Sequence, residues 1–292
     1  RGRRWEVGRE FPGRRADLER VVYTTISYAP KGWYLDAWRP YKWGDNGREW
    51  LGGEKPTPGY DDLTAYAPFA DIDLTDDVKQ RRPSGDIPRE RVETALRLYI
   101  DAFAELAGGR EHVFALDSVG GAYVMLAPTS TAPIAERYGP DARRRLFNDL
   151  TDRMNDWLDG VKADVNDAVD VAGTFEPDLL NNKNRLYKAP MSVHSSLDGV
   201  VTPVDVDAPA YEYTPLERVG DAERDAAVEW AADITSDHTD AVSAVVAGLW
   251  PDYYDEADDW GDALDERLND LRAEQREHEG HRERLRAVAV PD

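Results

Sequence analysis

The chain has 292 residues, 58 of them acidic and 36 basic, which gives a formal net charge of −22. Hydrophobic residues make up 41% of the sequence and nine residues are tryptophan, so the chain can bury a core and is not a disordered acidic tail. The absence of cysteine excludes disulfides, cysteine-ligated zinc and thiol catalysis. No apolar run approaches the roughly 20 residues of a membrane helix and no signal peptide is visible, so we expect a cytoplasmic protein without membrane contacts.

The excess of acid is spread along the whole chain, and only seven of the 36 basic residues are lysine. This composition is typical of proteins adapted to very high salt, because salt screens the self-repulsion of acidic surfaces. An ordinary acidic protein is the alternative. An acidic chain normally argues against nucleic-acid binding, but counterion release contributes little in molar salt, so net charge does not exclude DNA.

The first predicted elements are strands over residues 21–28 and 33–38, which are rich in β-branched and aromatic residues. Residues 40–62 are rich in glycine, proline and tryptophan and indicate a long loop. Three aromatic side chains near this loop are candidates for stacking on template bases: Trp38, Trp43 and Trp50. Because aromatic loops usually pack against the protein itself, a structural role is the alternative.

The middle of the chain alternates strands and helices. Residues 68–74 (PFADIDL) predict a strand, and residues 79–88 a polar, partly basic loop. The spacing of apolar residues predicts a helix over residues 90–109, ended by two glycines. Two apolar strands, over residues 112–116 and 122–127, then flank a tight glycine turn.

The second half predicts a helix over residues 140–161, a late strand over 200–206, and charged helical sequence from about residue 217. The elements lack the regular βαβ rhythm of a doubly wound sheet. The predicted class is therefore α+β, with mixed or antiparallel sheets flanked by helices. We expect a core over residues 1–215 and an acidic helical C-terminal extension over residues 216–292.

Two acids, Asp71 and Asp73, lie one residue apart in the predicted strand 68–74. Because side chains alternate between the faces of a strand, both carboxylates point the same way, with Cα atoms roughly 7 Å apart. Such a pair can bind divalent cations, and nucleotidyl transfer uses two of these ions about 3.5–4 Å apart. Asp205 and Asp207 have the same spacing, so the pattern alone is weak evidence in so acidic a chain.

Residues 178–199 form a basic segment in an acidic protein. Three bases and one histidine lie in it: Lys183, Arg185, Lys188 and His194. Such side chains on an extended segment can clamp a triphosphate, and Asp178 could complete a metal site. The alternative is a surface loop whose bases pair with nearby acids.

With these elements in order, the sequence resembles the archaeo-eukaryotic primase superfamily, and within it the catalytic small subunit of DNA primase. The family carries an Asp-x-Asp strand, a Ser-x-His-type turn, and a third acid before a segment that ends in Lys-x-Pro-x-Ser-x-His. The strand PFADIDL matches the first feature. The last segment matches at Asn184, Arg185, Leu186, Lys188, Pro190, Ser192 and His194. The resemblance covers roughly residues 20–210 and implies a primase–polymerase core.

The resemblance implies template-directed polymerisation of NTPs or dNTPs on DNA, with two Mg²⁺ or Mn²⁺ ions and no zinc. Asp71, Asp73 and Asp178 would be both catalytic residues and metal ligands, with Asp170 as the fallback for the third acid. The nucleotide-binding residues would be Ser118, Tyr123, Arg185, Lys188 and His194. An accessory subunit or a fused helicase-type domain is a further partner to expect.

The chain departs from the family in the middle motif, where Tyr123 or Val124 falls at the position of a phosphate-binding histidine. A tyrosine can donate a hydrogen bond to a phosphate but brings no charge. The bases often found inside that turn are replaced by Val119, Gly120 and Gly121. The resemblance therefore implies a divergent member, from a halophilic archaeon or its mobile elements. Its nucleotide site either recruits bases from elsewhere, such as Arg39 or Arg48, or is weakened. De novo priming is the activity most exposed to this loss.

Three rival interpretations stay open. A primase-like domain that binds nucleotides or nucleic acid without polymerising is favoured by the lost histidine. Another two-metal enzyme, a nuclease or phosphohydrolase, explains the acids but not the segment from Lys188 to His194. An acidic interaction domain, in which every motif is coincidence, predicts that Asp71 pairs with Arg or Lys and that Asp178 lies elsewhere.

Overall fold

The computed structural model describes residues 4–7, 21–25, 27–28, 41–44, 47–50, 60–179, 181–182, 185–194 and 197–288. Before residue 60 it describes only the backbone of five short strands. The predicted strand over residues 33–38 lies outside the described residues, as do the side chains named above in the N-terminal part and Lys183. The proposals for Trp38, Trp43, Trp50, Arg39 and Arg48 therefore stay predictions.

Strands and helices alternate along the described chain. The strands are β1 (Arg4–Val7), β2 (Val21–Thr25), β3 (Ser27–Tyr28), β4 (Tyr41–Gly44), β5 (Gly47–Trp50), β6 (Ala65–Tyr66), β7 (Phe69–Leu74), β8 (Val113–Asp117), β9 (Gly121–Leu126), β10 (Phe175–Asp178), β11 (Leu186–Lys188) and β12 (Thr202–Val204). The helices are α2 (Asp76–Arg81), α3 (Arg89–Ala107), α4 (Ala132–Arg137), α5 (Pro140–Val169), α6 (Asp221–Asp233), α7 (Val242–Leu249), α8 (Pro251–Tyr254) and α9 (Trp260–Val288).

The largest sheet has the strand order β10–β7–β9–β8–β12, and every described pairing in it is antiparallel. Strand β7 lies between β10 and β9, so Asp71 is the cross-strand partner of Asp178 on one side and of Tyr123 on the other. A smaller sheet joins β1, β2 and β11. Antiparallel sheets with flanking helices confirm the predicted α+β class.

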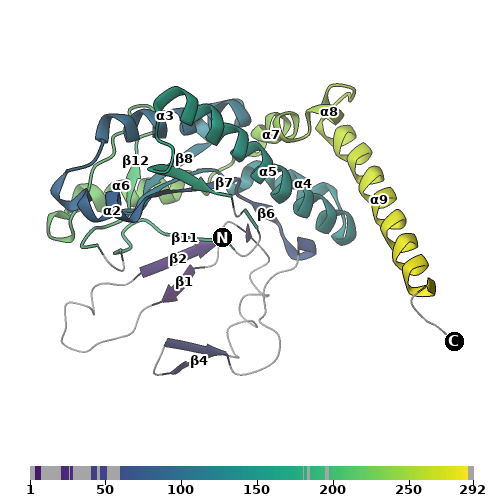
Figure 1. Cartoon of the computed structure of the whole chain (residues 1–292), viewed down its shortest axis with the longest axis horizontal. Coiled ribbons are helices and arrows are strands. Elements are labelled where there is room, and N and C mark those ends of the chain that lie inside the picture. The colour runs from purple at the N-terminus through teal and green to yellow at the C-terminus, as the bar shows by residue number, and fades with distance from the viewer. Residues whose placement is uncertain are drawn as a thin grey trace.

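One face of the large sheet is apolar, and Ala70, Ile72 and Leu74 of β7 are buried on it. Helix α3 belongs to the same core through the residues whose spacing predicted it: Val92, Leu96, Ile100 and Phe103. Because side chains alternate along a strand, the opposite face of β7 carries Asp71 and Asp73. In Figure 1, α3 lies above the sheet while β1, β2 and β11 lie below it.

The segment predicted as a loop over residues 79–88 begins instead with helix α2 and a 3₁₀ turn, Arg82–Ser84. The helix is short, and only Val78 in it is buried, so apolar spacing gave little signal. Its acids lie in the first turn and its bases in the last, which suits the helix dipole. The predicted long loop over residues 40–62 likewise contains the β4–β5 hairpin.

The C-terminal part packs on the same core as the rest of the chain. Trp230 of α6 lies edge-on to Phe114 of β8, with ring centroids 6.0 Å apart. Arg267 of α9 and the Trp250 indole nitrogen both donate to Asp149 of α5. A single core cluster therefore runs across the expected division between residues 215 and 216. The later turns of α9 project away from the body (Figure 1), and none of the described helices could cross a membrane.

Candidate functional site

Acidic side chains share one face of the large sheet because β7 and β10 are paired. The register sets Asp71 opposite Asp178 and Asp73 opposite Glu176. Residues directly opposite in an antiparallel pair share a face, with Cα atoms about 4.5–5.5 Å apart. The pairing thus places Asp71, Asp73 and Asp178 on one face, although 107 positions separate the first from the last. Glu176 shares this face and pairs with Lys162.

The guanidinium of Arg185 lies between two of these acids. It donates to Asp71 at 2.5 Å and to Asp178 at 3.0 Å, just before β11 begins. The side chain of Asp71 is 17% exposed and that of Asp178 is 38% exposed, so solvent screens the first contact less. The pairing of Asp71 with an arginine agrees with one prediction of the interaction-domain rival, whereas the position of Asp178 contradicts the other.

The charge of this cluster stays unbalanced even with Arg185 present. Burial, and next the negative charge of Asp73, raise the pKa of Asp71 to about 6, although Arg185 and Lys188 pull it down. An ionised carboxylate is costly where water is excluded and a like charge is close. The site would therefore gain free energy from a further positive charge near Asp71.

Lys188 and His194 lie on the same side of the molecule as the acids. The Lys188 ammonium donates to the Tyr123 hydroxyl at 3.4 Å. Tyr123 of β9 lies directly opposite Asp71 of β7. Burial lowers the pKa of Lys188 below its ordinary value, and the charge of Lys79 lowers it further.

The imidazole of His194 is neutral at neutral pH. Burial, followed by the charges of Lys188, Lys79 and Arg82, lowers its pKa to about 4. Its Nδ1 accepts a hydrogen bond from the Leu197 amide at 3.2 Å, which leaves Nε2 as the protonated nitrogen. His194 is thus a hydrogen-bond donor at this site rather than the fixed positive charge that the sequence suggested.

The glycine turn between β8 and β9 forms the floor beside the acids. Gly121 has no room for a side chain, because an added Cβ would collide with the Ile72 carbonyl oxygen of β7. Arg82 is almost fully buried and pairs with Asp117 at the start of the turn, while its guanidinium stacks 3.8 Å from the centre of the Tyr211 ring. Ser118 is buried in this turn.

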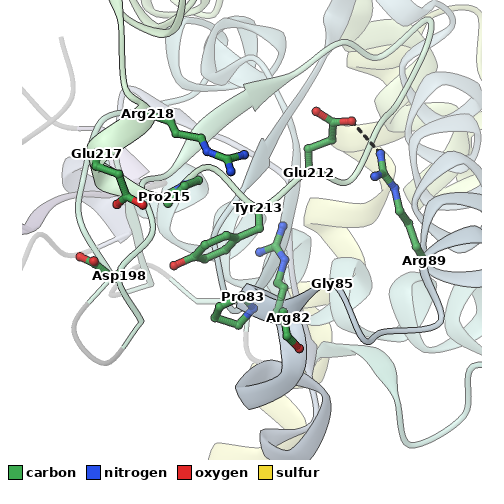
Figure 2. Close-up of a pocket in the computed structure, with 11 residues that line it drawn as sticks. Arg82, Pro83, Gly85, Arg89, Asp198, Glu212, Tyr213, Pro215, Glu217 and Arg218 are labelled. Carbon is green, nitrogen blue, oxygen red and sulfur yellow. Dashed lines mark hydrogen bonds and ion pairs between the residues drawn. The ribbon is translucent and has the colours of Figure 1, made fainter.

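A cavity of about 640 Å³ lies beside Arg82 and is distinct from the acid cluster. Figure 2 shows charged side chains of both signs around it, with Arg89 paired to Glu212 at 2.8 Å. None of the acids or bases of the cluster lines this cavity. We place the candidate site at the cluster, because a polar face with several perturbed groups is the stronger sign of chemistry.

The structure separates the two candidates for the third acid. Asp170 caps the end of α5, where its side chain is 92% exposed and 3.9 Å from Arg91. Asp178, in contrast, lies beside Asp71. Two basic residues near the site, Lys79 and Arg82, were not predicted from the sequence, since they fall in the segment taken for a loop. Only the run of bases in KQRR could have drawn attention to them.

The carboxylates are suitable ligands for a divalent cation, but their present ion pairs occupy the oxygens that would bind it. In the part of the chain that the structure describes, no three His, Asp or Glu side chains gather in ligating geometry. Instead, Arg185 bridges Asp71 and Asp178, and Lys79 lies 3.4 Å from Asp73. Carboxylate oxygens are the ligands that Mg²⁺ and Mn²⁺ prefer, and the raised pKa of Asp71 favours such an ion once Arg185 moves away.

Comparison of the chain with protein-family models, curated proteins and solved structures found no match.

Proposed function

We propose that this chain is a template-directed nucleotidyltransferase of the archaeo-eukaryotic primase superfamily, which adds NTPs or dNTPs to a growing nucleic-acid strand on DNA. The observation that carries the proposal is that Asp71, Asp73 and Asp178 share one sheet face, with Arg185 and Lys188 close by. A nuclease or phosphohydrolase explains the acids but not the match of the segment from Lys188 to His194. Polymerisation needs both acids and cationic groups, because the triphosphate must be held while pyrophosphate leaves.

In this proposal Asp71, Asp73 and Asp178 hold two Mg²⁺ or Mn²⁺ ions. Ions bound there would activate the 3′-hydroxyl of the primer and neutralise the charge that develops on the leaving pyrophosphate. Arg185 must release Asp71 and Asp178 before both can act as ligands. Its guanidinium then becomes available to a phosphate oxygen, for which its planar fork of donors is well suited.

Lys188 and His194 hold the phosphates of the incoming nucleotide. Lys188 supplies a positive charge close to Tyr123, and His194 supplies an Nε2–H donor. Tyr123 fixes the Lys188 ammonium through its hydroxyl, which gives it a role despite the missing histidine. Ser118, buried in the turn, orients this floor of the site.

The test is primer extension on a defined template with Mg²⁺ or Mn²⁺, using NTPs and dNTPs separately. The variants Asp71→Asn and Asp178→Asn should each lower incorporation by about a hundredfold or more. Each removes a carboxylate that would hold the metal ions, and these ions would stabilise the charge of the transition state. Asp205→Asn is the matched control, since this acid belongs to the second Asp-x-Asp pair and is exposed outside the site. Incorporation that persists in both variants, with contaminating polymerase excluded, would refute the proposal.

One observation favours a second function, nucleotide or nucleic-acid binding without polymerisation. Arg185 pairs with two of the three acids, which is a stable arrangement without any metal ion. If this alternative holds, the wild-type chain binds nucleotides in the presence of a chelator and incorporates none with Mn²⁺. The first function instead requires metal-dependent incorporation.

A further inference from the structure

Lys79 points from helix α2 into the site, although nothing in the sequence motifs involves it. Its side chain is only 19% exposed, which is low for a lysine on a short surface helix. The Lys79 ammonium lies 3.4 Å from the Asp73 carboxylate, whose side chain is 54% exposed. Because Asp73 is half-exposed, a ligand bound beside it can also contact the Lys79 ammonium.

The stem of Lys79 and the ring of His194 close on the same point above the glycine turn. The Lys79 Cε and Cδ lie 3.1 and 3.2 Å from the position that a Cβ on Gly120 would occupy. His194 Nε2, the protonated nitrogen, lies 3.1 Å from that position. Gly120 leaves room at the point where a lysine from α2 and a histidine from the 186–194 segment approach, since a Cβ there would make tight contacts with both.

Lys188 lies near these two groups, beside Tyr123, and the positive charges of Lys79 and Lys188 repel each other while His194 is neutral. The charges of Lys79 and Lys188 both lower the pKa of His194, after burial, and the charge of Lys79 lowers that of Lys188. Like charges that converge in a partly buried place are unfavourable unless an anion joins them. Asp73 offsets part of this repulsion for Lys79, and a polyanion would offset the rest.

We propose that Lys79, Lys188 and His194 form one anion pocket above Gly120, which binds the triphosphate of the nucleotide. Lys79 thereby supplies the positive charge that the glycine turn itself lacks. The identity of the anion as a nucleoside triphosphate rests on the proposed function. The pocket itself requires only a polyphosphate, so it can be tested without catalysis.

The experiment measures binding of inorganic tripolyphosphate to the metal-free chain by calorimetry, at one fixed salt concentration. Lys79→Met should weaken binding about tenfold or more, because a charged hydrogen bond to phosphate is lost. Lys79→Arg should retain most of the affinity. Lys162→Met is the matched control, since this lysine is 28% exposed and pairs with Glu176, and its loss changes the net charge equally. Circular dichroism and thermal unfolding check that each variant is folded.

The inference is overturned if Lys79→Met binds tripolyphosphate as tightly as the wild type, if Lys162→Met weakens binding equally, or if the wild type does not bind it. Its failure is separable from failure of the proposed function. A wild type that binds tripolyphosphate through Lys79 but incorporates no nucleotide supports the pocket and refutes the polymerase. If the wild type polymerises and Lys79→Met leaves the nucleotide KM unchanged, the polymerase is supported and the pocket is refuted.

Discussion

Replacing Asp71 by Asn should make the metal-free protein more stable at neutral pH. The pKa of Asp71 rises from an ordinary value of 3.8 to about 6 in the fold, through burial and the charge of Asp73. A group whose pKa is raised by folding favours the folded state when protonated, and that advantage is lost as the pH rises through the folded pKa. Asparagine resembles the protonated carboxyl and keeps the advantage at every pH.

The magnitude follows from the two pKa values. The difference between 3.8 and about 6, at about 1.4 kcal/mol for each pH unit, corresponds to about 3 kcal/mol in the free energy of unfolding. The variant and the wild type should be equally stable near pH 4 or below. The gap should open between pH 4 and pH 6 and reach its full size of about 3 kcal/mol above pH 7.

The assay is urea unfolding of both proteins between pH 4 and pH 8, with chelator present and ionic strength fixed. Asp205→Asn serves as the control, and its stability difference from wild type should stay small at every pH because Asp205 is exposed. Millimolar Mn²⁺ should then stabilise the wild type above pH 6 and leave Asp71→Asn unchanged. A variant that is no more stable than wild type at pH 8, or a gap that does not depend on pH, would show this reasoning to be wrong.

Three further substitutions test how the site is built, each by chemical denaturation. Gly121→Ala should cost about 3 kcal/mol or more, because the new methyl meets a backbone oxygen of β7, whereas Gly160→Ala, with open space around it, should be neutral or stabilising. Arg82→Met should cost about 3–5 kcal/mol by leaving a buried carboxylate unpaired, while loss of the exposed Arg81 should have little effect on stability. Trp230→Ala should cost about 3–5 kcal/mol if α6 belongs to the common core, and a cost below about 1 kcal/mol would contradict that.

Local elements with strong patterns could be predicted from the sequence. Helix α3 was predicted within two residues of its observed ends, because its apolar stripe and terminal glycines are local signals. Strand β7 was predicted equally well from its alternation. Helix α2 and the β4–β5 hairpin were missed, since a short polar helix and a glycine- and tryptophan-rich hairpin carry little periodic signal.

The site depends on tertiary pairings that no local pattern contains. The spacing of Asp71 and Asp73 predicted a shared face, but the meeting with Asp178 requires the β7–β10 register. The resemblance anticipated that meeting, whereas the bridging position of Arg185 became visible only in three dimensions. The inward turn of Lys79 over Gly120 likewise became visible only in three dimensions.

The central claim is that one pocket holds divalent ions at its acids and a triphosphate at its basic groups. The most direct measurement is a crystal structure with Mn²⁺ and a non-hydrolysable nucleoside triphosphate, with the ions located by anomalous scattering. The account predicts manganese peaks at Asp71 and Asp178, Arg185 displaced from both, and the triphosphate beside Lys79, Lys188 and His194. Arg185 still bridging the two acids at saturating Mn²⁺, with the nucleotide bound elsewhere or not at all, would contradict it.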